Sequence, residues 1–76
     1  MPHITVKHFP RDLNEEQKKA LADDLCEMVK KHFGSKDGSL SVALIPVEQE
    51  RWKEEVYDVE IGPELETLAR KPGYSL

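Results

Sequence analysis

Apolar and polar residues alternate over the first stretch of the chain. Residues 2–9 (PHITVKHF) place Pro2, Ile4 and Val6 on one face and polar side chains on the other, a pattern that predicts a β-strand. Proline is tolerated at the first position of a strand, because no backbone donor is needed there. The strand should end at Phe9-Pro10, since proline has no N–H with which to continue the ladder.

Residues 15–33 carry apolar side chains at a helical spacing, and this stripe should lie against a sheet. Asn14 and Gln17 form a capping-box pattern at its start, and the segment from Asp12 to Glu15 offers the same pattern two residues earlier. Gly34 supplies a left-handed residue to end the helix. The stripe comprises Leu21, Leu25, Val29 and Phe33, widened by Ala22, Cys26 and Met28.

Residues 39–46 (SLSVALIP) form an apolar run with few polar interruptions. Such a run is typical of a strand covered on both faces, most often a parallel one. A strand, a long helix and a second strand joined by short connections make a βαβ unit. The fold class expected is therefore α+β.

The pattern weakens after Val47. Residues 48–55 are highly charged around Trp52 and fit either a helical turn or an irregular segment. The alternation of Tyr57, Val59 and Ile61 predicts a short strand, and Gly62-Pro63 should open a short helix that ends near Arg70.

With 76 residues, the chain predicts a single domain over residues 1–76 with a thin core. Two strands make a poor sheet, and the long helix can cover only one of its faces. Cys26 is the only cysteine, so no disulfide supports the fold and a reducing cytoplasmic location is expected. A second copy of the chain should cover the remaining face.

The charge and hydropathy patterns exclude several classes of partner. Fifteen acidic against 11 basic residues give a formal charge of −4, which argues against nucleic-acid binding. The longest uncharged run, residues 38–47, is too short to cross a bilayer, and no secretory signal opens the chain.

Pro2 is the residue with the clearest potential chemistry. Removal of Met1, which is usual before a small residue, would leave a free secondary amine at the start of a strand. An α-amino group titrates near pH ~8, and an apolar pocket lowers that pKa toward neutrality. An amine poised there can abstract a proton beside a carbonyl. Proline is also common at position 2 without any chemical role.

Several short motifs accompany Pro2. They are Pro2-His3-Ile4, Phe9-Pro10-Arg11, Ser35-Lys36-Asp37 after the long helix, Trp52, and the ending Lys71 to Ser75. Together they resemble the 4-oxalocrotonate tautomerase family over nearly the full length, and within it a dimeric bacterial branch. The resemblance implies a tautomerase-type βαβ subunit that is completed by oligomerisation.

The resemblance also implies an isomerase that interconverts keto and enol groups without metal or cofactor. Pro2 would be the general base, Arg11 the carboxylate-binding residue and Trp52 an aromatic wall. Where 4-oxalocrotonate tautomerase has a second-strand arginine, eleven residues before Trp52, this chain has Ser41. A hydroxyl stabilises an enolate less than a guanidinium does. An aromatic 2-keto monoacid of the phenylpyruvate kind is therefore expected rather than a dicarboxylate.

Geometry adds a further expectation about Pro2 and Arg11. An extended strand rises about 3.3 Å per residue, so these residues of one chain should lie on the order of 25 Å apart. If both act on one substrate, the site lies between subunits of a homodimer or a larger assembly.

Other interpretations remain open from the sequence. Arg11 could be a solvated surface charge, and Trp52 an interface or core anchor. The same scaffold could serve a hydratase or dehalogenase with Pro2 as an acid, or a non-catalytic interaction protein. His3 and His8 fall on opposite faces of the first strand and do not form a metal site, while Tyr57 and Tyr74 are alternative proton donors.

Overall fold

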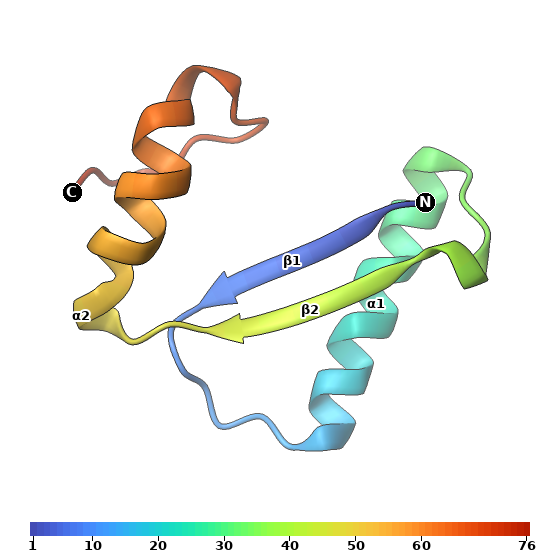
Figure 1. Cartoon of the computed structure of the whole chain (residues 1–76). Coiled ribbons are helices and arrows are strands. Elements are labelled where there is room, and N and C mark those ends of the chain that lie inside the picture. The colour runs from blue at the N-terminus through green and yellow to red at the C-terminus, as the bar shows by residue number, and fades with distance from the viewer.

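The computed structural model describes all residues 1–76, and its centre is a parallel pair of strands joined by a long helix (Figure 1). β1 (His3–His8) pairs with β2 (Ser41–Pro46) in a register that runs from His3 opposite Ser41 to His8 opposite Pro46. α1 (Glu15–Phe33) connects them, so the βαβ prediction is confirmed. The second strand begins two residues later than expected, because a short turn, η1 (Asp37–Ser39), precedes it.

The two ends of α1 are set by local hydrogen bonds. The Asn14 side chain accepts from the backbone N–H of Gln17 (2.8 Å), and the Gln17 side chain accepts from the backbone N–H of Asn14 (2.9 Å). At the other end Gly34 has φ 67°, and its N–H donates to the carbonyl of Lys30 (2.8 Å). The later of the two start sites is therefore used, because both halves of its capping box form.

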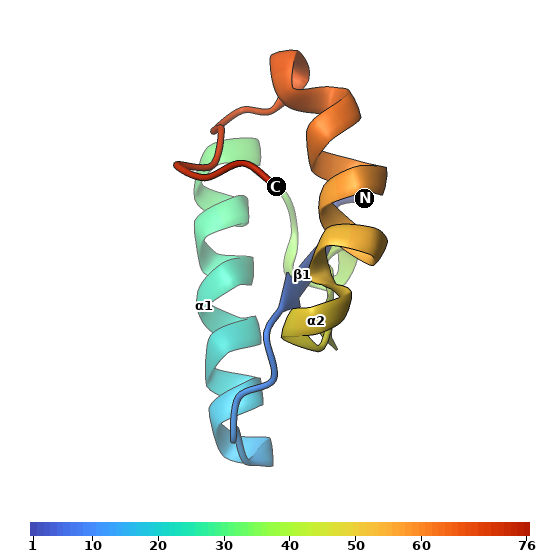
Figure 2. The same ribbon diagram turned by 90° about the vertical axis from the view of Figure 1, so that its left-hand side faces the viewer.

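The sheet has one covered and one open face. Ile4 and Val6 of β1 pair with Val42 and Leu44 of β2, and all four are half-buried on the face that carries α1. The opposite face carries His3, Thr5 and Ser41, which are exposed. In Figure 2, α1 lies on one side of β1, and the C-terminal helical segment (residues 49–67) lies on the other.

The apolar stripe of α1 is only partly covered. Leu21, Leu25 and Val29 are half-buried as expected, but Met28 and Phe33 are 53% and 73% exposed. A helix of 19 residues is about 28 Å long, whereas six-residue strands span about 20 Å. The two strands are therefore too short to cover the whole stripe. Neither α1 nor any other helix here has the length and apolar character required to span a bilayer.

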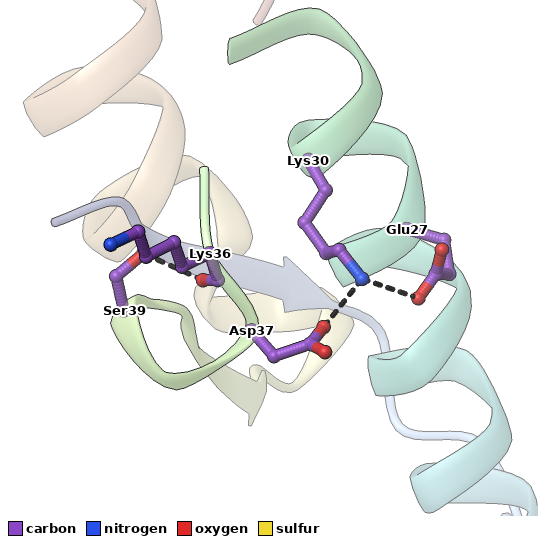
Figure 3. A network of polar contacts seen from close by, with 5 residues as sticks. All are labelled: Glu27, Lys30, Lys36, Asp37 and Ser39. Carbon is purple, nitrogen blue, oxygen red and sulfur yellow. Dashed lines mark hydrogen bonds and ion pairs between the residues drawn. The ribbon is translucent and has the colours of Figure 1, made fainter. Parts of the chain in front are cut away.

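An ion pair between Lys30 and Asp37 holds the connection between α1 and β2 to the helix (Figure 3). Lys30 lies between Glu27 and Asp37 and donates to both carboxylates, while the Ser39 hydroxyl donates to the Lys36 carbonyl (2.8 Å). The hydrogen bond to Asp37, followed by that to Glu27, raises the pKa of Lys30 above its usual value. A raised lysine pKa stabilises the fold at neutral pH, and that contribution is lost only in strongly alkaline solution.

The chain beyond Val47 is helical throughout its ordered elements, so the short strand predicted around Tyr57 is wrong. α2 (Gln49–Trp52) runs directly into a wide π-type helix, η2 (Lys53–Ile61), which is followed by a 3₁₀ helix, η3 (Gly62–Thr67). The expected short helix thus begins at the predicted position and ends three residues before Arg70.

A helical repeat explains why the alternation of Tyr57, Val59 and Ile61 misleads. Trp52, Val56, Tyr57 and Ile61 are spaced by four, one and four residues, which places them on one side of a helix. Val56 and Tyr57 are buried, whereas Val59 is 63% exposed. Burial therefore follows the helical repeat and not the strand repeat.

Three links hold the C-terminal helical segment to the strands. The Val47 N–H donates to the His8 carbonyl (2.8 Å) and continues the ladder beyond β2. The Lys7 side chain, on the open face of β1, forms an ion pair with Glu60 of η2. Phe9, directly after β1, meets Trp52 edge to face, with ring centroids 5.1 Å apart. The segment thus contacts the sheet near the carboxyl ends of its strands.

A single chain buries little of its own surface. Val47, Val56 and Tyr57 are its buried side chains. The accessible surface is 6167 Å², whereas a compact protein of 8.7 kDa exposes about 4,700 Å². The radius of gyration is 14.1 Å, against about 11 Å for a compact chain of this length. The chain therefore exposes more surface than a compact protein of its mass and is more extended than a compact chain of its length.

The capping box gives a direct test of how α1 begins. Asn14→Ala removes the side-chain acceptor for the Gln17 N–H and should lower the free energy of unfolding by about 1 kcal/mol. Urea denaturation at a fixed protein concentration measures this change. Asp12→Ala is the matched control and should leave stability unchanged; a larger loss from Asp12→Ala than from Asn14→Ala would contradict the assignment.

Candidate active site

A pocket of about 660 Å³ opens where β1 ends, between the Phe9–Arg11 turn, the α2–η2 helix and the C-terminal residues. Three separate parts of the chain build it, and the last of these folds back from beyond η3. Its apolar walls are Phe9, Trp52, Tyr74 and Leu76, and its cations include Arg11 and Lys53. An apolar cavity with a few polar groups is the usual form of a small-molecule site.

Aromatic contacts hold the C-terminal residues in place. The Trp52 indole N–H donates to the Tyr74 hydroxyl oxygen (3.0 Å). The Phe9 ring contacts the same Trp52 ring edge to face. The Tyr74 ring also contacts the buried ring of Tyr57, with centroids 5.9 Å apart and planes inclined at 42°. Trp52 is therefore a wall of the pocket and the point to which the C-terminal segment is anchored.

Of the two cationic side chains in the pocket, only one has no acidic partner within the chain. Lys53 donates to both carboxylate oxygens of Asp58 (3.2 and 3.0 Å), so its charge is already neutralised. Arg11 is exposed and forms no ion pair with any acidic residue of the chain. A free guanidinium beside apolar walls is suited to bind a carboxylate, because it can donate two parallel hydrogen bonds.

His8 contributes a further polar group to the pocket. Its Nδ1 lies 2.7 Å from the Phe9 carbonyl oxygen. Since a carbonyl only accepts, Nδ1 must carry the proton, and in the neutral ring Nε2 is left as an acceptor. The sequence pattern placed His8 on a strand face and did not associate it with Arg11.

Pro2 and Ser41 lie at the opposite end of the sheet. The Ser41 N–H donates to the Pro2 carbonyl (3.3 Å), and the Ser41 hydroxyl lies 2.6 Å from Nδ1 of His3. Pro2 is half-buried, and Met1 ahead of it is fully exposed. While Met1 is attached, the Pro2 nitrogen is an amide nitrogen without basicity.

The residues singled out from the sequence thus fall into two pairs. Arg11 and Trp52 share one pocket, and Pro2 and Ser41 lie side by side at the amino ends of the strands. The six residues of β1 separate the pairs by about 20 Å. Within one chain the structure does not bring Pro2 to Arg11.

Tyr74 is the pocket residue that the sequence could not select. Nothing in the pattern distinguishes it from Tyr57, and its place depends on the chain folding back after Thr67. The one available signal was the glycine–proline content of the last residues, which ends the helix and permits a reversal. Tyr57 is instead a buried residue of η2 and does not line the pocket.

Comparison with known proteins identifies the relatives of this chain. A protein-family model described as tautomerase enzyme matches residues 2–56. The chain is 64% identical over 75 residues to "Tautomerase PptA" of Pectobacterium carotovorum subsp. carotovorum, covering 99% of both chains. Proteins of the same name from an Enterobacter strain and from Escherichia coli are 60% and 50% identical over all 76 residues. These matches extend past residue 56 and include the C-terminal wall of the pocket.

The free cation in the pocket predicts binding of aromatic carboxylates. Phenylacetate should change the fluorescence of Trp52, the only tryptophan, and Arg11→Met should weaken its binding roughly tenfold by removing a charge-assisted contact. Arg70→Met is the matched control, because Arg70 is exposed and lies outside the pocket. Equal affinities for Arg11→Met and the unmodified protein would refute the role of Arg11.

Proposed function

Because this chain belongs to the tautomerase family, we propose that it interconverts the keto and enol forms of a 2-keto carboxylic acid, with the Pro2 amine as general base. The observation that carries the proposal is the pairing of an uncommitted Arg11 with the aromatic wall at Trp52 in one pocket. That pairing provides for a carboxylate and an apolar substituent on the same small molecule.

Removal of Met1 turns the Pro2 nitrogen into a secondary amine at the start of β1. An amine of this kind has a pKa near ~8 in water, and loss of surrounding water lowers it because the cation loses solvation. Pro2 is half-buried already, and a partner chain packed against the amino end of β1 would dry it further. The neutral amine then removes a proton next to the keto group and returns it to another atom. No metal or cofactor takes part in this reaction.

The charges of the pocket favour a substrate with one carboxylate. Arg11 is free, whereas Lys53 is occupied by Asp58, and Ser41 beside Pro2 is neutral. The second carboxylate of a dicarboxylate substrate would find no free cation to bind. Phe9 and Trp52 provide an aromatic surface in the same pocket as Arg11, so an aromatic 2-keto monoacid resembling phenylpyruvate is the proposed substrate.

The distance between Pro2 and Arg11 supports a site shared by two chains. Pro2 of one protomer would meet Arg11 and Trp52 of its partner, and Ser41 would accompany Pro2. The exposed surface of one chain exceeds that of a compact protein by about 1,400 Å², an excess comparable with one partner's share of an obligate dimer interface. We therefore propose a homodimer, with larger assemblies open, and a cytoplasmic location consistent with the free Cys26 thiol.

The role of Pro2 is tested by phenylpyruvate ketonisation. Protein shown by intact mass to lack Met1 should be active, and protein with an uncleaved residue ahead of Pro2 should be at least about 100-fold slower, since an amide nitrogen cannot act as a base. Equal rates would eliminate Pro2 as the base. Water addition to an acetylenic acid in place of ketonisation would identify a hydratase on this scaffold.

The shared site is tested by mixing two variants that are each impaired in a different half of the site and are assayed at substrate concentrations well below KM. Chains with a blocked Pro2 and chains with Arg11→Met are unfolded together and refolded as a random mixture. If each site takes Pro2 from one chain and Arg11 from the other, half of the dimers contain one intact site, and about a quarter of the wild-type activity returns. Light scattering gives the assembly size. No recovery in mixed dimers would place the site within one chain.

A further inference from the structure

The hydrogen bond between Trp52 and Tyr74 has a fixed direction. An indole nitrogen only donates, so the Tyr74 oxygen must be the acceptor of the 3.0 Å contact. A tyrosine hydroxyl has one proton of its own, and no acceptor within the chain receives it. Tyr74 lines the same pocket as Arg11 and is 46% exposed, so a small molecule can reach it.

From this arrangement we propose that the Tyr74 hydroxyl donates a hydrogen bond to the substrate's keto oxygen, and that Trp52 orients it. This inference rests on the proposed function and adds a catalytic residue to it. Occupation of one lone pair by the indole restricts the rotation of the hydroxyl, and donation by Trp52 makes the remaining proton a better donor.

The position of Tyr74 suits the keto oxygen of a 2-keto acid. The keto carbon is bonded directly to the carboxylate carbon, so a donor in the pocket of Arg11 lies close to both groups. When Pro2 of the partner subunit removes the neighbouring proton, negative charge builds on the keto oxygen and the hydrogen bond from Tyr74 strengthens. The proton of Tyr74 stays on its own oxygen throughout. The proton taken from carbon moves to the Pro2 nitrogen and is then delivered to the keto oxygen, which completes the enol.

Tyr74 thereby compensates for the neutral residue on the second strand. Ser41 occupies the position at which the resemblance predicts an arginine, and its hydroxyl already contacts His3. Tyr74 comes from another element and approaches from the side of Arg11. Its ring is held between Trp52 and the buried Tyr57, which gives this donor a defined place despite its position in a segment without regular structure.

The test compares Tyr74→Phe with Tyr57→Phe in Met1-free protein. Tyr74→Phe retains the ring and removes the hydroxyl, so kcat for phenylpyruvate ketonisation should fall roughly 100- to 1,000-fold, the range expected for loss of one donor to a developing oxyanion. KM should rise only several-fold, so that most of the loss falls on kcat. Tyr57→Phe keeps the ring that contacts Tyr74 and removes only a hydroxyl outside the pocket, so it should match the unmodified protein. Trp52→Phe retains the Tyr74 hydroxyl without its orienting donor and should give an intermediate kcat.

A binding measurement separates a direct contact from a structural role. Phenyllactate carries an oxygen at the keto position, and 3-phenylpropanoate lacks it; both are titrated against Trp52 fluorescence. Tyr74→Phe should weaken phenyllactate several-fold and leave 3-phenylpropanoate unchanged. An equal loss for both ligands, or no loss for either, would overturn the assignment. Because this comparison does not require turnover, it decides the role of Tyr74 even if Pro2 proves not to be the base.

Discussion

The length and pairing of β1 constrain everything else in this molecule. Six residues of extended chain separate Pro2, which precedes β1, from Arg11, which follows it. The parallel ladder with β2 keeps that separation rigid, since each residue from His3 to His8 has a paired partner. A base and an anion-binding group placed in this way cannot serve one substrate within a single chain, so the proposed chemistry requires association.

The same sheet also leaves surface that the proposed association would cover. Two short strands cover only part of one helix and leave their own second face with His3, Thr5 and Ser41 in contact with solvent. The C-terminal helical segment reaches this side through the Lys7–Glu60 ion pair, but that contact lies toward the carboxyl end. The amino end, where Pro2 lies, stays open. The surface that lacks a cover thus lies near Pro2, whose nitrogen would need a dry environment in the proposed reaction.

Local signals predicted the first two-thirds of the fold well. The bounds of α1 followed from Asn14, Gln17 and Gly34, whose effects act within a few residues. The C-terminal part could not be predicted in the same way, because the residues from Trp52 to Ile61 satisfy both an alternating and a helical repeat. Burial of Val56 and Tyr57 in the folded chain decides between them, and burial depends on contacts distant in sequence.

The candidate site shows the same division between local and distant information. The turn after β1 and the spacing of Trp52 from β2 were enough to associate Arg11 with an aromatic wall through the family resemblance. Tyr74 joins them only because its hydroxyl meets an indole 22 residues earlier in the chain. His8 was interpreted only as a strand residue, since the pattern does not show that the last residue of β1 borders the pocket.

The fold-back that brings Leu76 to the pocket mouth also limits how the protein can be handled in the laboratory. A purification tag or fluorescent fusion appended there would crowd the entrance, and one placed ahead of Pro2 would cap the proposed base. Labels are better inserted between Gly34 and Ser39, a surface connection anchored by Lys30 and remote from both. Any assay that relies on terminal fusions would report on an obstructed molecule.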